Sequence, residues 1–326
     1  MQFVAIRVVM GFYWIFLSLC RLTQSMKILT VGTVAFDAIE SPFGKVDKII
    51  GGAATYISWS ASYYTKELAI VSVIGGDYDM ESLDRLRARG VDTSGLEIKE
   101  DEKSFFWSGR YHTDMNTRDS LDTQLNVLLS FDPKVPANHQ DAEILMLGNI
   151  DPALQMKVID QMNNPAFIVL DTMNFWMEIK LDVLKEVVKR VNLLTINDEE
   201  ARLLTGEYSL KKASQKILAM GPQYLIIKKG EHGALLFSKD DMFFAPALPL
   251  EDVFDPTGAG DTFAGGLVGY LAQREAFTFE ELKQGVIHGS MMASYCVESF
   301  GPQRLMELND TMRMERLEEF RKLTKF

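Results

Sequence analysis

The chain has only two cysteines and four histidines among its 326 residues, and this scarcity excludes several classes of protein. Cys20 and Cys296 have no Cys or His neighbours at metal-ligand spacing, so neither a disulfide framework nor a Cys/His metal site is expected. The formal net charge of −11 disfavours nucleic acid and anionic membrane as partners, because both require clustered Lys and Arg. The remaining composition, 47% hydrophobic and 24% charged, is typical of a globular protein with a sizeable core.

Two common phosphate-binding motifs are also missing. The chain has no Gly-x4-Gly-Lys-Ser/Thr sequence, which excludes a P-loop protein. Its glycines do not form a Gly-x-Gly-x-x-Gly pattern directly after a strand, which disfavours a dinucleotide-binding protein.

The first 25 residues differ from the rest of the chain. Residues 8–20 form a nearly uncharged run after Arg7, which resembles the apolar part of a signal peptide and is short for a membrane span. No Ala-x-Ala cleavage site follows, and Met26 directly precedes an apolar, β-branched run. We therefore interpret residues 1–25 as a mis-assigned start or signal-like leader and expect one cytoplasmic domain over residues 26–326.

From residue 27 onward, short apolar runs alternate with amphipathic segments. Strands are expected at 27–33, 68–74, 144–147, 167–171, 192–196, 224–228 and 234–238, and helices at 51–64, 79–89, 153–161, 179–189, from 198, 258–273, 278–299 and 308–323. This alternation predicts an α/β fold with a doubly wound, mostly parallel sheet and helices on both faces. Two hairpin-like insertions interrupt it, at about 34–51 and 103–130, the second pairing 103–111 with 121–129.

The most informative stretch is a glycine-rich loop that leads into a helix. Gly258, Ala259 and Gly260 precede Asp261, and the apolar residues after it have helical spacing. Backbone N–H groups at a helix N-terminus lack internal partners and attract anions, so a phosphate is expected there. A carboxylate beside that phosphate is tolerable if a hydroxyl lies between them, with Asp261 as the general base that accepts its proton. The alternative is a turn followed by an ordinary N-terminal helix charge.

This stretch resembles a known family signature. The run Asp255-Pro256-Thr257-Gly258-Ala259-Gly260-Asp261-Thr262-Phe263 is similar to the C-terminal signature of the ribokinase-like, or PfkB, carbohydrate kinases. The resemblance implies a ribokinase-like fold with a small β-strand lid, and transfer of phosphate from ATP, with Mg²⁺, to a hydroxyl of a small sugar or polyol. It also implies a possible K⁺ site near Asp255 and Thr257, and a possible homodimer through the lid.

The same resemblance suggests an acceptor site. Asp37 would bind two sugar hydroxyls, and Gly51 and Gly52 would allow close approach of the substrate. Many sugar kinases have Asn four residues after the second glycine, whereas this chain has Tyr56, which leaves room for a polyol or a base-bearing substrate. Asn149 and Asn174 follow expected strands and are further candidates; Trp176 stands where the family often has Arg.

The lid pattern leaves the class of acceptor open. Phe105, Trp107, Gly109 and Tyr111 alternate and so share one face of a strand. If that face stacks a base, the protein is a nucleoside kinase of the same fold; otherwise these aromatic residues belong to the packing of the lid. A third possibility is a ribokinase-like binding module without activity, although the base and the glycine loop are both present.

The resemblance also implies which residues bind ATP, the phosphate donor, and its Mg²⁺. Asn197 and Glu200 match an Asn-x-x-Glu element that would hold Mg²⁺ through water, and they also fit a helix capping box. The residues expected to surround the nucleotide are Asn197, Lys229, Gly230, Gly233, Thr257, His288 and Gly301.

Overall fold

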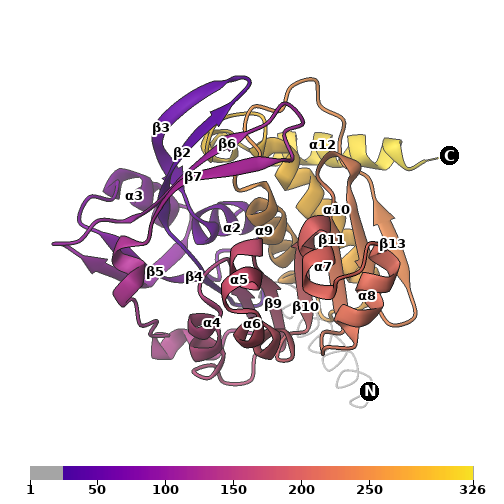
Figure 1. Cartoon of the computed structure of the whole chain (residues 1–326), viewed down its shortest axis with the longest axis horizontal. Coiled ribbons are helices and arrows are strands. Elements are labelled where there is room, and N and C mark those ends of the chain that lie inside the picture. Colours follow the sequence, from indigo (N-terminus) through magenta and orange to yellow (C-terminus); the bar gives the residue numbers. More distant parts are fainter. Residues whose placement is uncertain (1–24, 326) are drawn as a thin grey trace, which may run out of the picture.

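The computed structural model describes residues 25–325, so residues 8–20 lie outside the described part (Figure 1). Within that part, a nine-stranded sheet has the order β13 (Met242–Ala245), β12 (Ala234–Phe237), β11 (Tyr224–Lys228), β10 (Leu193–Asn197), β9 (Phe167–Asp171), β8 (Ile144–Leu147), β1 (Ile28–Val31), β4 (Leu68–Gly75), β5 (Val91–Lys99). Neighbouring strands are parallel from β11 to β5, and only β12 and β13 are antiparallel. The carboxyl ends of the parallel strands therefore form one edge.

Helices cover both faces of this sheet. One layer contains α2 (Ala53–Ala61), α3 (Met80–Ala88), α9 (Ala259–Leu271), α10 (Phe279–Cys296), α11 (Gln303–Met306) and α12 (Asp310–Leu323). The other contains α4 (Pro152–Ile159), α5 (Asn174–Ile179), α6 (Leu181–Val188), α7 (Asp198–Thr205) and α8 (Leu210–Leu218). The expected α/β architecture is confirmed.

Strand alternation explains the two cores. In β11, Ile226 packs into the core of the α9 layer, whereas Leu225 and Ile227 pack into the opposite core. Successive strand residues point to opposite faces, so a strand that is apolar throughout serves both layers. The last residue of such a strand then points toward one layer at the edge of the sheet.

A second, four-stranded sheet projects beside the large one, and we call it the lid sheet (Figure 1). Its order is β3 (Gly44–Gly51), β2 (Ala35–Ser41), β6 (Phe105–Tyr111), β7 (Arg118–Gln124). The β2–β3 and β6–β7 pairs are antiparallel, and β2 pairs with β6 in parallel. Every residue of β7 is exposed.

The structure differs from the expected elements in several places. The predicted strand at 121–129 ends at Gln124, and a 3-10 helix (Asn126–Ser130) follows. Strands β5 and β13 were not predicted, because both mix polar and apolar residues at or near the ends of the sheet order. The predicted helix at 179–189 begins earlier as the short helix α5, and α8 and α11 were also missed.

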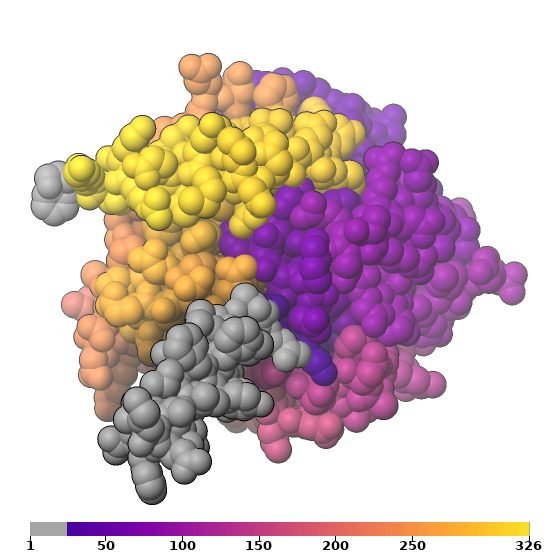
Figure 2. Space-filling view, turned by 180° about the vertical axis from the view of Figure 1, so that it is seen from behind, coloured from indigo at the N-terminus to yellow at the C-terminus, as the bar shows by residue number. Residues whose placement is uncertain are grey.

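The C-terminal helix α12 lies across the back of the molecule (Figure 2, yellow). Arg313 on α12 donates a hydrogen bond to the backbone oxygen of Tyr63, just after α2, at 2.8 Å. Among residues 25–325, no helix has the length and apolar character that crossing a bilayer would require.

Candidate active site

The glycine-rich loop forms the N-terminus of α9. Gly258 is in the left-handed conformation (φ 75°) that favours glycine, and it precedes the first helical residue. Ala259 donates its N–H to the oxygen of Pro256 at 3.1 Å, so that amide already has a partner, and its predicted role in holding phosphate stays a prediction. Within residues 25–325, the N–H groups of Gly258, Gly260 and Asp261 donate no hydrogen bond and remain open to an anion.

Asp261 lies in the first turn of α9. Burial and the negative charge of Asp171 raise the pKa of Asp261 to about 7, whereas Lys228 and Arg118 act in the opposite direction. No hydrogen bond to the Asp261 carboxyl is found in the described part of the chain. A carboxyl group with this pKa, beside open amides, suits a general base at neutral pH.

Asp255 lies just before this loop and fixes the chain there by hydrogen bonds. Its carboxylate accepts N–H bonds from Thr257 at 2.8 Å and from Gly301 at 3.0 Å, and its side chain is buried. Burial raises the pKa of Asp255. The Thr257 hydroxyl donates to the Tyr111 hydroxyl of the lid sheet at 3.2 Å. The structure therefore joins Asp255, Thr257 and Gly301 into one network under the loop.

Asp37, on β2, is buried near the loop. A Cβ on Gly51 would lie 1.9 Å from a carboxylate oxygen of Asp37, so glycine leaves room for that side chain. Burial and the charges of Asp255 and Asp261 raise the pKa of Asp37 to about 8, while the Gly52 N–H lowers it. The structure thus brings Asp37, Gly51 and Gly52 together on the side of Asp261.

These buried carboxyl groups predict that stability depends on pH. A pKa of about 8 for Asp37 means that the folded protein binds more protons than the unfolded chain above about pH 4, so stability falls as pH rises and levels off near pH 8. Asp37→Asn removes this contribution. We expect the loss of melting temperature between about pH 5 and about pH 9 to be smaller in the variant than in the wild type. An equal loss in both proteins would contradict the assignment.

Tyr56 lies differently from the expectation. Its side chain is 1% exposed, and a Cβ on Gly258 would lie 2.4 Å from its ring, so the ring packs under the loop and offers no open face to a substrate. Within residues 25–325 its hydroxyl has no hydrogen-bond partner. Burial raises the pKa of Tyr56 far above its ordinary value.

Asn149 follows β8 and is held by Trp176. Trp176 Nε1 donates to Asn149 Oδ1 at 2.8 Å, and Asn149 Nδ2 lies 3.0 Å from the sulfur of Met173. The indole and the Met173 sulfur therefore fix the orientation of the Asn149 amide. Asn174 is the first residue of α5, and its Oδ1 accepts the N–H of Phe175 at 3.0 Å.

Trp176→Phe tests whether this indole orients Asn149. Asn149 is a predicted substrate-binding residue, so loss of one hydrogen bond worth about 1 kcal/mol predicts a substrate KM about 3- to 10-fold higher with little change in kcat. Because the effect passes through Asn149, adding Trp176→Phe to Asn149→Ala should raise KM no further. Additive effects in this cycle would show that Trp176 acts by another route.

Asn197 and Glu200 form a complete capping box at the start of α7. Asn197 Oδ1 accepts the N–H of Glu200 and Glu200 Oε2 accepts the N–H of Asn197, both at 2.8 Å. Burial raises the pKa of Glu200 to about 7, and Lys228 counteracts it. Among residues 25–325, no three His, Cys, Asp or Glu side chains lie close enough to hold a metal directly. Buried carboxylates that suffer mutual repulsion fit Mg²⁺ held mainly through water and phosphate.

The β11–β12 turn contains the predicted nucleotide residues Lys229, Gly230 and Gly233. Both glycines have positive φ, 54° and 82°. A Cβ on Gly230 would lie 2.1 Å from the side-chain oxygen of Asn116, which belongs to the turn between β6 and β7. The tip of the lid sheet therefore contacts this turn.

His288 lies on α10, beside two tyrosine side chains. Its Nδ1 lies 3.1 Å from the hydroxyl of Tyr64, and its ring stacks on Tyr270 with centroids 4.5 Å apart. Tyr270 is ten residues after Gly260 in α9, roughly 15 Å along the axis. Burial lowers the pKa of His288 to about 4. The ring therefore belongs to an aromatic cluster with Tyr64 and Tyr270, and the role of His288 at the nucleotide stays a prediction.

Two charged residues at the edge of the sheet were not predicted as site residues. Lys228 ends β11 and lies 3.1 Å from both carboxylate oxygens of Asp171, which ends β9. A charged residue at the end of an otherwise apolar strand is the signal that could have identified both. Arg118, at the start of β7 in the lid sheet, is a third residue that was not predicted. Its positive charge lowers the pKa of Asp261 and of Glu200.

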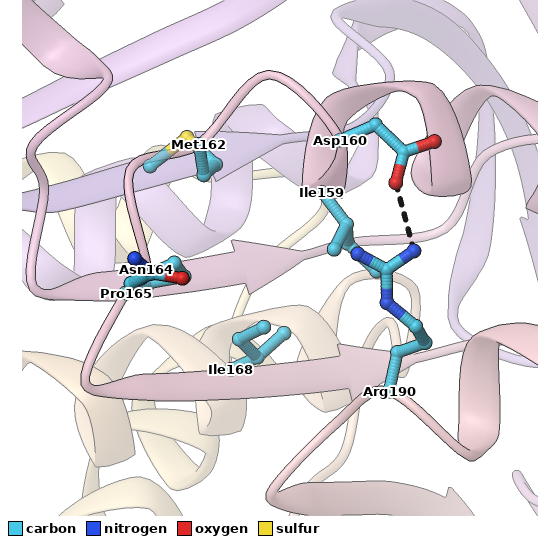
Figure 3. A pocket seen from close by; sticks show the side chains of 7 residues that line it. All are labelled: Ile159, Asp160, Met162, Asn164, Pro165, Ile168 and Arg190. Carbon is cyan, nitrogen blue, oxygen red and sulfur yellow. Dashed lines mark hydrogen bonds and ion pairs between the residues drawn. The ribbon is translucent and has the colours of Figure 1, made fainter.

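A pocket of about 320 Å³ lies elsewhere, at the amino end of β9 (Figure 3). Its lining is Ile159, Asp160, Met162, Asn164, Pro165, Ile168 and Arg190. Arg190 and Asp160 pair at 2.8 Å across it. Because ligands of parallel α/β sheets bind at the carboxyl ends of the strands, this pocket is separate from the candidate active site.

Comparison with known proteins identifies the family and the fold of this chain. The chain is 30% identical to the cytidine kinase of Thermococcus kodakarensis over 254 residues, which cover 76% of this chain and 90% of that protein. The structure of Burkholderia thailandensis nucleoside kinase in complex with ADP-inosine matches with a TM-score of 0.74 at 20% identity, covering 90% and 95% of the two chains. An E. coli protein assigned as a ribokinase II, in complex with ATP and Mg²⁺, matches with a TM-score of 0.74 at 18% identity over 91% and 99%.

The fold and these findings define a phosphotransferase whose acceptor is a hydroxyl group. The chain belongs to the pfkB family of carbohydrate kinases, whose sequence pattern matches residues 27–309.

Proposed function

We propose that this protein is an ATP-dependent nucleoside kinase that phosphorylates a hydroxyl on the sugar of its acceptor. The 30% identity to a cytidine kinase supports a nucleoside over a free sugar or polyol. The observation that carries the proposal lies in the lid sheet, where a carboxylate and an aromatic ring stand side by side.

Asp37 and Trp107 are register partners in the parallel β2–β6 pair, so their side chains leave the same face of the lid sheet. A Cβ on Gly109 would lie 2.1 Å from the Trp107 indole, so the ring lies along the strand over that glycine. Tyr111, on the same face of β6, contacts Thr257, which turns this face toward the glycine loop. A carboxylate accepts from two sugar hydroxyls, while an adjacent indole offers a surface to a base.

Asp261 is the general base in this mechanism. It takes the proton of the acceptor hydroxyl as the oxygen attacks the γ-phosphorus of ATP. The open N–H groups of Gly258, Gly260 and Asp261 bind the negative charge of the transferring group, and the helix N-terminus adds to that attraction. The lid sheet excludes water, which suppresses hydrolysis of ATP.

We assign Mg²⁺ to Asn197 and Glu200, acting through water. The ion would neutralise charge on the phosphates of ATP. The buried carboxyl groups of Glu200 and Asp261, both with a pKa of about 7, support a divalent cation at this edge. Asn197→Ala should raise the Mg²⁺ concentration needed for half-maximal activity; an unchanged titration would overturn the assignment.

A panel of acceptors tests the proposed function. Cytidine, adenosine and inosine should be phosphorylated with higher kcat/KM than ribose, fructose or myo-inositol at equal ATP. A preference for a free sugar or myo-inositol would replace the nucleoside with a sugar or polyol. Protection by ATP against melting, without transfer to any alcohol, would instead indicate a binding module.

Three further points belong to this proposal. We place the kinase domain at residues 26–326 in the cytoplasm, with lid insertions at about 34–51 and 103–130. Comparing the activity of chains starting at Met1 and Met26 tests the boundary.

We assign a K⁺ to the network around Asp255 and Thr257, to be tested by exchanging K⁺ for Na⁺. The fully exposed edge strand β7 supports a homodimer through the lid sheet, to be tested by sedimentation.

A further inference from the structure

Lys228 places a buried positive charge beside the first turn of α9. Its Nζ lies 3.1 Å from both carboxylate oxygens of Asp171, and the two side chains are only 17% and 7% exposed. A Cβ on Gly260 would lie 3.0 Å from that nitrogen. The ammonium therefore lies next to the open N–H groups of Gly260 and Asp261.

The position of this pair at the edge of the sheet is informative. Ile226 and Val169 pack into the core on the α9 side, and Lys228 and Asp171 follow them two residues later on the same faces of β11 and β9. Both charges stand where parallel α/β sheets bind ligands. A buried ion pair loses hydration and adds little net stability, so packing alone gives a weak reason for it.

The charges around Lys228 show that a phosphoryl group bound here would need a cation beside it. Burial lowers the pKa of Lys228, but Asp171, Glu200 and Asp261 outweigh it, so the pKa lies above its ordinary value and the ammonium stays charged. A phosphoryl group that reaches the amides of α9 would meet these three carboxyl groups. Lys228 is the cation fixed to the large sheet at this point, whereas Arg118 belongs to the lid sheet.

We propose that Lys228 is a catalytic residue whose ammonium, held by Asp171, binds an oxygen of the transferring phosphoryl group. This inference rests on the proposed kinase function. In the step concerned, the acceptor oxygen forms a bond to the γ-phosphorus, and the bond from that phosphorus to the β–γ bridging oxygen breaks. The electron pair leaves with ADP, the acceptor proton goes to Asp261, and Lys228 keeps its proton.

Lys228→Met tests the proposal, because it keeps the length of the side chain and removes the charge. We expect kcat to fall about 10²-fold, as for loss of one donor to a developing charge, with acceptor KM changed far less. Affinity for ATP should fall more than affinity for ADP, which lacks the γ-phosphate. The matched control is Lys239→Met, at an exposed lysine of the β12–β13 turn, which should behave as wild type.

A double variant separates catalysis from structure. Lys228→Met leaves Asp171 buried without its cation, which can destabilise the fold. Lys228→Met with Asp171→Asn replaces the ion pair by a neutral pair. A structural role predicts that turnover recovers in the double variant, and that recovery would overturn the proposal. Turnover that stays about 10²-fold low, with a melting temperature near that of the wild type, supports it.

Failure of this inference can be told apart from failure of the proposed function. If the wild type phosphorylates no nucleoside or sugar, the proposed function fails. The ratio of ATP to ADP affinity, measured by calorimetry without any acceptor, still tests Lys228. A lower ratio in Lys228→Met supports contact with the γ-phosphate, whereas an unchanged ratio overturns it.

Discussion

Asp261→Asn is expected to lower kcat by about 10²- to 10⁴-fold while the protein folds normally. Asparagine keeps the shape of the side chain but cannot accept the proton of the acceptor hydroxyl. Its effect should appear mainly in kcat, since the amides proposed to bind phosphate belong to the backbone at the N-terminus of α9. Steady-state kinetics with saturating ATP and acceptor, together with the melting temperature, measure this result.

The matched control for Asp261→Asn is Asp252→Asn. Asp252 is exposed, lies on the approach to the same loop and gives the same change in charge. This control should keep wild-type turnover. Asp261→Asn with wild-type kcat would remove the general-base mechanism, whatever the control does.

Asp37→Ala is expected to lower kcat/KM for the acceptor by about 10²- to 10⁴-fold. The assay is made at about pH 9, where Asp37, with its pKa of about 8, is ionised. Each hydrogen bond from a hydroxyl to this carboxylate contributes about 1.5–3 kcal/mol, and the variant loses two of them. Slow hydrolysis of ATP without an acceptor should change little, because Asp37 lies on β2 and not among the donor residues.

Deoxynucleosides provide an independent check on Asp37. Wild type should discriminate strongly against an acceptor that lacks one of the two hydroxyls, whereas Asp37→Ala should lose most of that discrimination. The exposed lid acid Asp47 supplies the control, and Asp47→Ala should leave acceptor kinetics unchanged. Equal discrimination in wild type and Asp37→Ala would show that the carboxylate does not bind the sugar.

Local patterns allowed the main architecture to be predicted. The strand and helix alternation after residue 27 defines the α/β sheet, because each strand is apolar enough to be buried on both faces. The capping box of Asn197 and Glu200 is visible in four consecutive residues and is present in the structure. The family resemblance of residues 255–263 is likewise carried by one short segment.

Long-range packing could not be predicted in the same way. Lys228 and Asp171 are 57 residues apart, and their pairing depends on β10 lying between β9 and β11. The orientation of Tyr56 depends on α2 packing against α9, which turns the ring under Gly258. His288 has helical spacing that fits either side of α10, and only the packed structure shows that Tyr64 and Tyr270 take it.

The packing of Tyr56 against Gly258 has a consequence for how such a protein can diverge. The ring occupies the space that any side chain at position 258 would need. A lineage that changes residue 56 therefore also alters the support of the glycine loop, and the two positions are expected to evolve as a linked pair.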